Sequence, residues 1–268
     1  MKLGYQTNTW GGVVGAAGGV TCVKEAYYRA NGSTEQALAD IAAAGYEGFE
    51  LFEGNLMDYE SRPEAFAALI AEHRLNFVGV YTGGNFIYPD ILKDEFYKIE
   101  RVARLAASLG AEHLVIGGGA VRSDGIRDDD YDRLAEALNA LDDMARGLGL
   151  TPSYHPHLGT NVETREQLHR LMERTKIGLC PDTAHLEAGG SDPVEVIRTY
   201  IDRIPYVHFK DLKDGAFVPL GEGSQRFDEM LAVLDKHGYE GWVTVELDAY
   251  PDPKVGARMS MERLREWL

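Results

Sequence analysis

The chain has 268 residues, of which 44% are hydrophobic and 26% are charged, proportions that are ordinary for a globular protein. Its formal net charge is −16, from 43 acidic and 27 basic residues, and so acidic a surface repels phosphate backbones and anionic membranes. We therefore expect neither nucleic acid nor a membrane as a partner, and a neutral or metal-chelating small molecule as the substrate.

Short apolar runs alternate with helix-like segments from one end of the chain to the other. The runs predict strands at 3–7, 48–52, 77–81, 113–116, 151–155, 177–181, 206–209 and 242–247. The intervening patterns predict helices at about 34–44, 63–73, 95–109, 131–148, 164–174, 193–200, 227–237 and 260–268. A glycine-rich segment from 11 to 31 has no clear periodicity and predicts a long loop over the first strand.

Local signals mark several helix boundaries. Ser33 or Thr34 is a suitable N-cap for the first helix, and Gly45 follows its last apolar residue. Pro63 stands where a first helical turn accepts proline, and Gly110 ends the helix after the third strand. The sequence therefore predicts discrete helices between the strands.

Eight strand-plus-helix units favour a single-domain (β/α)8 TIM barrel over residues 1–268, and such barrels typically need about 250 residues. The strands are continuously apolar, as parallel strands buried on both faces are. The alternative is an open doubly wound sheet. That fold needs a glycine-rich phosphate turn after an early strand, and Gly117-Gly118-Gly119 does not have the required spacing.

Four consecutive strands end in side chains that can bind a metal: His155, Asp182, His208 and Glu246. The active site of a barrel lies where its strands end. Mixed nitrogen and oxygen ligands suit a transition metal better than calcium. Taken singly, each histidine has a structural interpretation, and Asp182 could cap the next helix. Together, the four predict one divalent metal ion at the C-terminal mouth.

Period-two alternation places a second polar residue on the same face of three of these strands. His157 shares a face with His155, Lys210 with His208, and Asp248 with Glu246. His157 is therefore a rival of His155 as the ligand from the fifth strand. The acidic run 128–130, with Glu47 and Glu53, is interpreted as solvated faces or helix caps, and His73, His113, His169 and His237 as structural.

With this pattern of strand-end residues, the chain resembles the xylose isomerase-like superfamily of sugar isomerases and epimerases. Within that superfamily it is most similar to the inosose dehydratases and related keto-sugar lyases. The resemblance covers nearly the whole chain. It is carried by the segments 45–51, 154–160, 182–185, 208–211, 221–223 and 238–246.

The resemblance implies metal binding by Asp182, His208 and Glu246, with a fourth ligand from the fifth strand that is usually a glutamate. His155 stands at that place here. The isomerases move a proton between two facing glutamates, so this departure weighs against isomerisation. Elimination needs only one base and one acid of differing strength. We favour Mn as the metal, with Co, Zn, Mg, Fe or Ni as alternatives.

The sequence-based hypothesis is a metal-dependent lyase that acts by β-elimination on a keto-inositol or 3-keto-sugar through an enediolate, as in inositol catabolism. His185, His157 and Lys210 are the candidates for proton transfer. Histidine titrates in the right range, and Lys210 would need its pKa lowered by burial and the nearby cation.

Candidate substrate contacts are Glu50, Trp10, Arg226 and Asp211. Each has a second interpretation. Glu50 could instead lie behind a metal ligand, Trp10 (like Phe86) could pack in the core, and Arg226 could lie on the surface. Asp211 could orient Lys210 or cap a turn.

Two other functions compete with the lyase. A keto-sugar isomerase or epimerase would act on simple ketoses, and an abasic-site nuclease of the same fold would need a basic face, which a net charge of −16 opposes. Two cysteines, Cys22 and Cys180, make no disulfide framework, and the N-terminus lacks the apolar run of a signal peptide. We expect a cytoplasmic enzyme, and by analogy with similar barrels a homo-oligomer.

Overall fold

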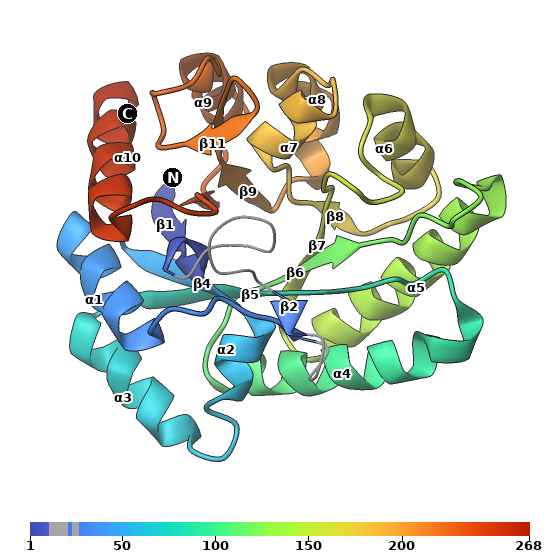
Figure 1. The fold of residues 1–268 in the computed structure, drawn as a ribbon, viewed down its shortest axis with the longest axis horizontal. Coiled ribbons are helices and arrows are strands. Elements are labelled where there is room, and N and C mark those ends of the chain that lie inside the picture. The colour runs from blue at the N-terminus through green and yellow to red at the C-terminus, as the bar shows by residue number, and fades with distance from the viewer. Residues whose placement is uncertain (11–20, 23–26) are drawn as a thin grey trace.

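The computed structural model describes residues 1–10, 21–22 and 27–268 of the chain (Figure 1). Most of the expected loop over the first strand lies outside the described residues. Among the described residues, eight strands form one sheet whose neighbouring strands all pair in parallel. In spatial order they are β8 (Gly178–Leu179), β7 (Thr151–His155), β6 (His113–Gly118), β5 (Asn76–Gly84), β4 (Gly48–Phe52), β1 (Lys2–Gln6), β12 (Trp242–Val245) and β9 (Tyr206–Phe209).

The two ends of this strand order, β8 and β9, meet through a single pairing. Asp182, just beyond β8, forms an isolated parallel bridge with His208 of β9, and the His208 amide donates to the Pro181 carbonyl over 3.0 Å. The sheet is therefore a nearly closed barrel, and helices surround it (Figure 1). The predicted (β/α)8 barrel is confirmed.

The main helices follow the strands as predicted. They are α1 (Thr34–Ala44), α3 (Pro63–His73), α4 (Pro89–Ser108), α5 (Asp128–Gly147), α6 (Arg165–Met172), α8 (Pro193–Tyr200), α9 (Phe227–Lys236) and α10 (Pro253–Trp267). The shorter elements are α2 (Glu53–Met57), α7 (Thr183–Ala188), the 3-10 turns η1 (Thr7–Thr9) and η2 (Ile201–Arg203), and the hairpins β2 (Thr21–Cys22) with β3 (Tyr27–Tyr28) and β10 (Asp211–Lys213) with β11 (Ala216–Val218).

The predicted boundaries of α1 are confirmed. The Ser33 side chain accepts from the Gln36 amide, and Gly45 adopts a left-handed conformation with φ of 92°. Two other helices begin earlier than predicted because a proline occupies the first turn. Pro89 opens α4, and Pro253 opens α10 after the Asp252 cap.

The acidic run at 128–130 forms the first turn of α5, three residues before the predicted start. Carboxylates are favourable there because the helix dipole is positive at that end. Asp130 is buried, accepts from the Arg127 amide over 3.1 Å and pairs with Arg122 at 2.7 Å. Of the two interpretations of this run, capping applies to Asp130.

The interior of the barrel is packed at its N-terminal end, which we call the floor. Val78, Val115, Tyr206 and Trp242 are buried there in one cluster. Gly48 is required beside them, because a Cβ at this position would lie 2.6 Å from Val78 Cγ2 and 3.0 Å from Trp242 Cη2. No helix in the described part of the chain has both the length and the apolar content needed to span a membrane.

Candidate metal centre and active site

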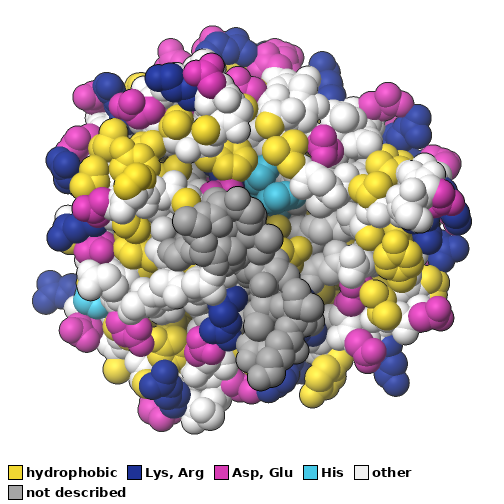
Figure 2. Space-filling view, viewed as in Figure 1, with side chains coloured by type: hydrophobic (Ala, Val, Ile, Leu, Met, Phe, Trp, Pro, Cys, Tyr) yellow, Lys and Arg dark blue, Asp and Glu magenta, His cyan; other side chains and the backbone are white. Residues whose placement is uncertain are grey.

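Four buried side chains meet at the opposite end of the barrel, which we call the mouth. His155 ends β7, Asp182 precedes α7, His208 lies in β9 and Glu246 follows β12. One potential ligand atom from each lies within 4.8 Å of the others. The sequence-predicted set is thus brought together, with His155 rather than His157 as its member from the fifth strand. In Figure 2, histidine side chains come to the surface near the centre of the face that is shown.

This metal-ligand cluster contains buried polar atoms that lack partners. His155 Nδ1 and Asp182 Oδ2 make no hydrogen bond to any described residue, and neither does the neighbouring Glu50 Oε1. Leaving such a group unsatisfied costs about 1–3 kcal/mol. His155 Nε2 lies 3.5 Å from Asp182 Oδ2 and 3.8 Å from Glu246 Oε2. Two imidazoles and two carboxylates converging in this way fit a divalent cation.

The two carboxylate oxygens of Asp182 have different surroundings. Oδ1 accepts from the His185 amide over 2.9 Å and caps α7, while Oδ2 is the potential ligand atom facing His155. The capping interpretation is therefore correct, and it leaves the second oxygen available as a ligand. Its position as the cap fixes the carboxylate in place before any ion binds.

Glu50 lies behind His208. Its Oε2 is 2.9 Å from His208 Nε2, while His208 Nδ1 is 2.7 Å from Glu246 Oε2. A carboxylate at one ring nitrogen fixes the tautomer and orientation of a metal-binding histidine. Of the two sequence-based interpretations of Glu50, this geometry favours support of a ligand over contact with substrate.

Lys210 is fully buried among acidic groups. Its Nζ lies 2.5 Å from Asp248 Oδ1, 3.1 Å from Glu246 Oε1 and 3.3 Å from His185 Nε2. Burial alone would lower the pKa of Lys210, but the charges of Asp248, Glu246 and Asp182 together raise it above the usual lysine value. The sequence-based requirement of a lowered pKa considered burial and a nearby cation, and the facing carboxylates act in the opposite direction. Lys210 is a cation here and can donate a proton.

His157 and His185 face each other with ring centroids 3.7 Å apart. Burial, with the charge of His155, lowers the pKa of His157 to about 4, and burial with the adjacent Lys210 lowers that of His185. Both rings are therefore neutral near pH 7. His157 Nδ1 donates to the Leu158 carbonyl over 2.7 Å, so its Nε2 is the basic nitrogen.

Two mouth residues were not predicted. Asn8, in the turn after β1, donates through Nδ2 to Glu246 over 3.0 Å and to Asp248 over 3.3 Å. Phe217 of β11 lies over the Lys210 ammonium, 4.2 Å from Nζ, and contacts His185 edge-on at 5.2 Å. The polar run at the end of the first strand was a signal for Asn8. The sequence carried no comparable signal for Phe217.

The two aromatic candidates lie in the core. Trp10 is buried, its indole nitrogen donates to Asp40 over 3.1 Å, and its ring packs edge-on against Tyr5. Phe86 is 1% exposed. Both rings belong to the buried core cluster, which favours core packing over stacking on a substrate.

Arg226 and Asp211 are also held in other interactions. The Arg226 guanidinium is half exposed and pairs with Asp192 at 2.7 Å and with Glu229 at 3.1 Å. Asp211 accepts from the amides of Gly221 and Gly223, each over 2.9 Å. Asp211 therefore fixes the loop that follows β11, and the structure brings neither residue into the metal-ligand cluster.

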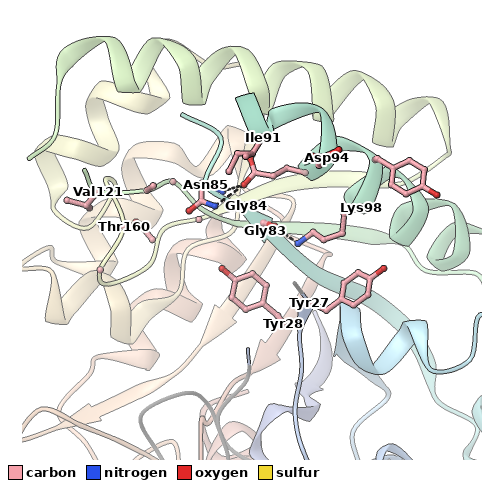
Figure 3. Close-up of a pocket in the computed structure, with 16 residues that line it drawn as sticks. Tyr27, Tyr28, Gly83, Gly84, Asn85, Ile91, Asp94, Lys98, Val121 and Thr160 are labelled. Atoms are coloured by element: carbon pink, nitrogen blue, oxygen red, sulfur yellow. Dashed lines mark hydrogen bonds between the residues drawn. The ribbon is translucent and has the colours of Figure 1, made fainter. Parts of the chain in front are cut away.

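A cavity of about 860 Å³ opens beside the mouth (Figure 3). Tyr27 and Tyr28 of β3 form one side, and residues of α4 that include Asp94 and Lys98 form another. The ends of β5 and β6 contribute glycine backbone, and Thr160 lies toward its far end. We call this cavity the side pocket.

The fold and site together define a class: a (β/α)8 barrel whose mouth holds a buried cluster of two histidines and two carboxylates beside acid and base groups. The chain belongs to the xylose isomerase-like TIM barrel family, whose model matches residues 38–267. The resemblance inferred from the sequence is confirmed at this level.

Curated relatives of the chain include inosose dehydratases. That of Lacticaseibacillus casei is 29% identical over 251 residues, which are 81% of this chain and 83% of the relative. Among solved structures, a xylose isomerase-like TIM barrel/4-hydroxyphenylpyruvate dioxygenase fusion protein superposes with a TM-score of 0.79 at 20% identity, covering 100% of this chain and 42% of the fusion. The zinc-bound IolI protein superposes with a TM-score of 0.77 at 18% identity, covering 100% and 98%. These two structures share the fold.

Proposed function

We propose that this protein is a divalent-metal-dependent carbon–oxygen lyase that eliminates water or an alcohol from a keto-inositol or a 3-keto-sugar. The observation that carries the proposal is the metal-ligand cluster at the mouth, with two neutral histidines and a buried lysine cation directly beside it. The inosose dehydratase relatives support the same reaction class.

His155, Asp182, His208 and Glu246 would hold the cation. Bound there, a divalent ion supplies Lewis-acid stabilisation of negative charge on the substrate carbonyl oxygen. Mn is the ion we favour, and the zinc-bound IolI protein, which shares the fold, keeps Zn among the alternatives. Glu50 keeps His208 oriented, and Asn8 with Lys210 fixes Glu246.

Different residues carry out the two proton transfers. A neutral imidazole, His157 or His185, removes the proton from the carbon next to the carbonyl. The electron pair of that C–H bond forms the new double bond as the β C–O bond breaks. Lys210, held as a cation by its carboxylates, gives a proton to the departing oxygen. The products are an enone and water or an alcohol, with no change in overall oxidation state.

His155 favours elimination over isomerisation. Isomerases of the superfamily use a glutamate at this place as one of two facing carboxylate bases. Here the imidazole of His155 lies 3.8 Å from Glu246, so the two bases differ in strength. An epimerase or isomerase is the second candidate, and it predicts exchange of the α proton without loss of water.

Metal removal tests the proposal. The protein is stripped with a chelator, reloaded separately with Mn, Co, Zn, Mg, Fe or Ni, and mixed with a keto-inositol or 3-keto-glucoside while enone absorbance is followed. We expect activity to require the ion. Asp182→Asn keeps the cap of α7 but loses the ligand charge, and should lower kcat/KM by at least about 100-fold. Glu47→Gln, an exposed carboxylate before β4, is the matched control and should have no effect. Full activity of the stripped protein would exclude the proposed function.

A further inference from the structure

Two sets of contacts join the residues that line the side pocket to residues of the mouth. Tyr28, which lines it, contacts Tyr81 edge-on at 5.3 Å, and Tyr81 contacts His155 edge-on at 5.4 Å. At the other end, the Thr160 hydroxyl donates to the His157 carbonyl over 2.7 Å. The pocket is therefore adjacent to the mouth, with the rings of Tyr28 and Tyr81 between it and His155 and with Thr160 beside His157.

Glycines at the bottom of the side pocket let the strand ends and Tyr28 approach one another closely. A Cβ on Gly83 would lie 2.9 Å from the Tyr28 ring, and one on Gly118 would lie 2.1 Å from the Gly84 carbonyl oxygen. Gly118 and Gly119 also have φ values of 110° and 102°, which other residues rarely adopt. Adjacent strand ends thus present backbone without side chains to the cavity.

The pocket walls are fixed by interactions among themselves. Lys98 pairs with the buried Glu53 at 2.9 Å and donates to the Gly83 carbonyl over 2.7 Å. Glu95 accepts from the backbone amides of Asn85 and Phe86 over 2.6 and 3.0 Å. These contacts hold α4 against the end of β5, so the cavity is formed before any ligand binds, which lowers the cost of binding.

The chemistry of the lining suits a ring-shaped, partly apolar group. Tyr27, Tyr28 and the 69% exposed Tyr97 provide aromatic surface, and Asp94 and Thr160 provide polar atoms at the edges. Aromatic faces with a few polar groups around them bind sugar or aryl rings. A volume of about 860 Å³ lies within the usual range of small-molecule sites.

We propose that the side pocket is a second subsite, which takes the group attached through the glycosidic oxygen of a keto-sugar whose ring lies at the metal-ligand cluster. This inference rests on the proposed function and narrows its substrate class to 3-keto-glycosides with a ring-bearing aglycone. The proton at C2 leaves to the base, the C1–O bond breaks, and a C1–C2 double bond forms. The glycosidic oxygen takes a proton, and the alcohol is released into the side pocket. A free keto-inositol, in contrast, would leave this cavity empty.

Two substrates with similar leaving groups test the inference: methyl and 2-phenylethyl 3-keto-β-D-glucoside. The wild type should show a KM for the phenylethyl compound lower by at least about tenfold, because burial of a ring contributes about 1.5 kcal/mol or more. Ala120→Phe places a ring in the pocket and should bring the ratio of the two KM values close to one.

Ala140→Phe is the matched control. Ala140 lines a separate cavity of about 540 Å³ formed by α4 and α5, and the same substitution there should leave the tenfold preference intact. Equal KM values in the wild type, or a preference that survives Ala120→Phe, would overturn the inference.

A binding measurement separates this inference from the proposed function. Saturation-transfer NMR on metal-stripped protein should detect 2-phenylethyl β-D-glucoside through its phenyl protons. The signal should be retained by the Ala140→Phe variant and lost by the Ala120→Phe variant. If neither keto-glucoside reacts but this pattern holds, the lyase proposal fails and the subsite stands. If both react but the pattern is absent, the lyase stands and the subsite fails.

Discussion

The floor and the mouth of the barrel are built from the same strands and have opposite chemistry. In β9, Tyr206 belongs to the floor and His208, two residues later on the same face, belongs to the metal-ligand cluster. In β12, Trp242 fills the floor and Glu246 reaches the mouth after Thr244. Between the two layers, the Tyr206 hydroxyl donates to Thr244 over 2.6 Å. Two residues along β9, and four along the β12 segment, thus separate packing from chemistry.

Along the barrel axis, the residues that stabilise the fold and the residues that could carry out chemistry therefore lie in different layers. Floor side chains such as Val78 and Trp242 are held mainly by close packing, whereas the mouth brings charged groups such as Asp182 and Lys210 within 3.8 Å of each other. Substitutions in the two layers should therefore affect different quantities. Floor variants should change the free energy of unfolding, and mouth variants should change metal affinity and turnover.

The largest effect is expected from Trp242→Ala in the floor. Trp242 is 1% exposed, and its loss should lower the free energy of unfolding by about 3–5 kcal/mol through the cavity it leaves. Denaturant titration measures this change. At temperatures where the variant is folded, its metal affinity should stay within about twofold of the wild type, because distant sites act independently. A large loss of metal affinity would show that the two layers are not separate.

A smaller effect is expected from acidifying the floor. His113 stacks on Tyr206 at 4.6 Å, and burial lowers the pKa of His113 to about 4, against 6.5 in an unfolded chain. Between pH 6.5 and about 4, the unfolded state therefore binds a proton at His113 that the folded state does not bind. Stability falls as pH drops from 6.5 toward 4, by about 3 kcal/mol from this residue. His113→Phe should keep the stacking and flatten this part of the stability–pH curve, and identical curves would contradict the assignment.

The smallest effect is expected from Glu50→Gln, which leaves the fold intact but weakens the orientation of His208. Loss of a carboxylate behind a metal-binding histidine should lower metal affinity by about 10- to 100-fold. Metal titration followed by calorimetry measures it, with the exposed Glu47→Gln as the reference. An affinity equal to the reference would mean that Glu50 does not support His208.

Most of the fold was predictable because its signals are local. Continuous apolar runs located the strands, and Ser33 with Gly45 bounded α1 to the residue. The predictions erred where a local signal was given too little weight, as at Pro89 and Pro253, or where an element was too short to show periodicity, as in α7 and the β10–β11 hairpin.

The residue types of the candidate site were predictable, but the hydrogen-bond and charge partners of each residue were not. The strand-end rule identified the members of the metal-ligand cluster from their positions alone. It could not show that Asn8 bonds to Glu246, because 238 residues separate them. The charge of Lys210 likewise depends on Asp248 facing it, which is a property of the assembled mouth.

The single pairing that joins β8 to β9 has a consequence for how the molecule responds to its surroundings. Asp182 and His208, which make that pairing, are also two of the four candidate ligands. An ion held by both would cross-link the barrel where its backbone hydrogen bonds are fewest. Because such an ion binds only the folded state, its free concentration would set how often the ring of strands opens at this joint. Hydrogen exchange at the His208 amide would then be slow when the ion is bound and faster when it is absent.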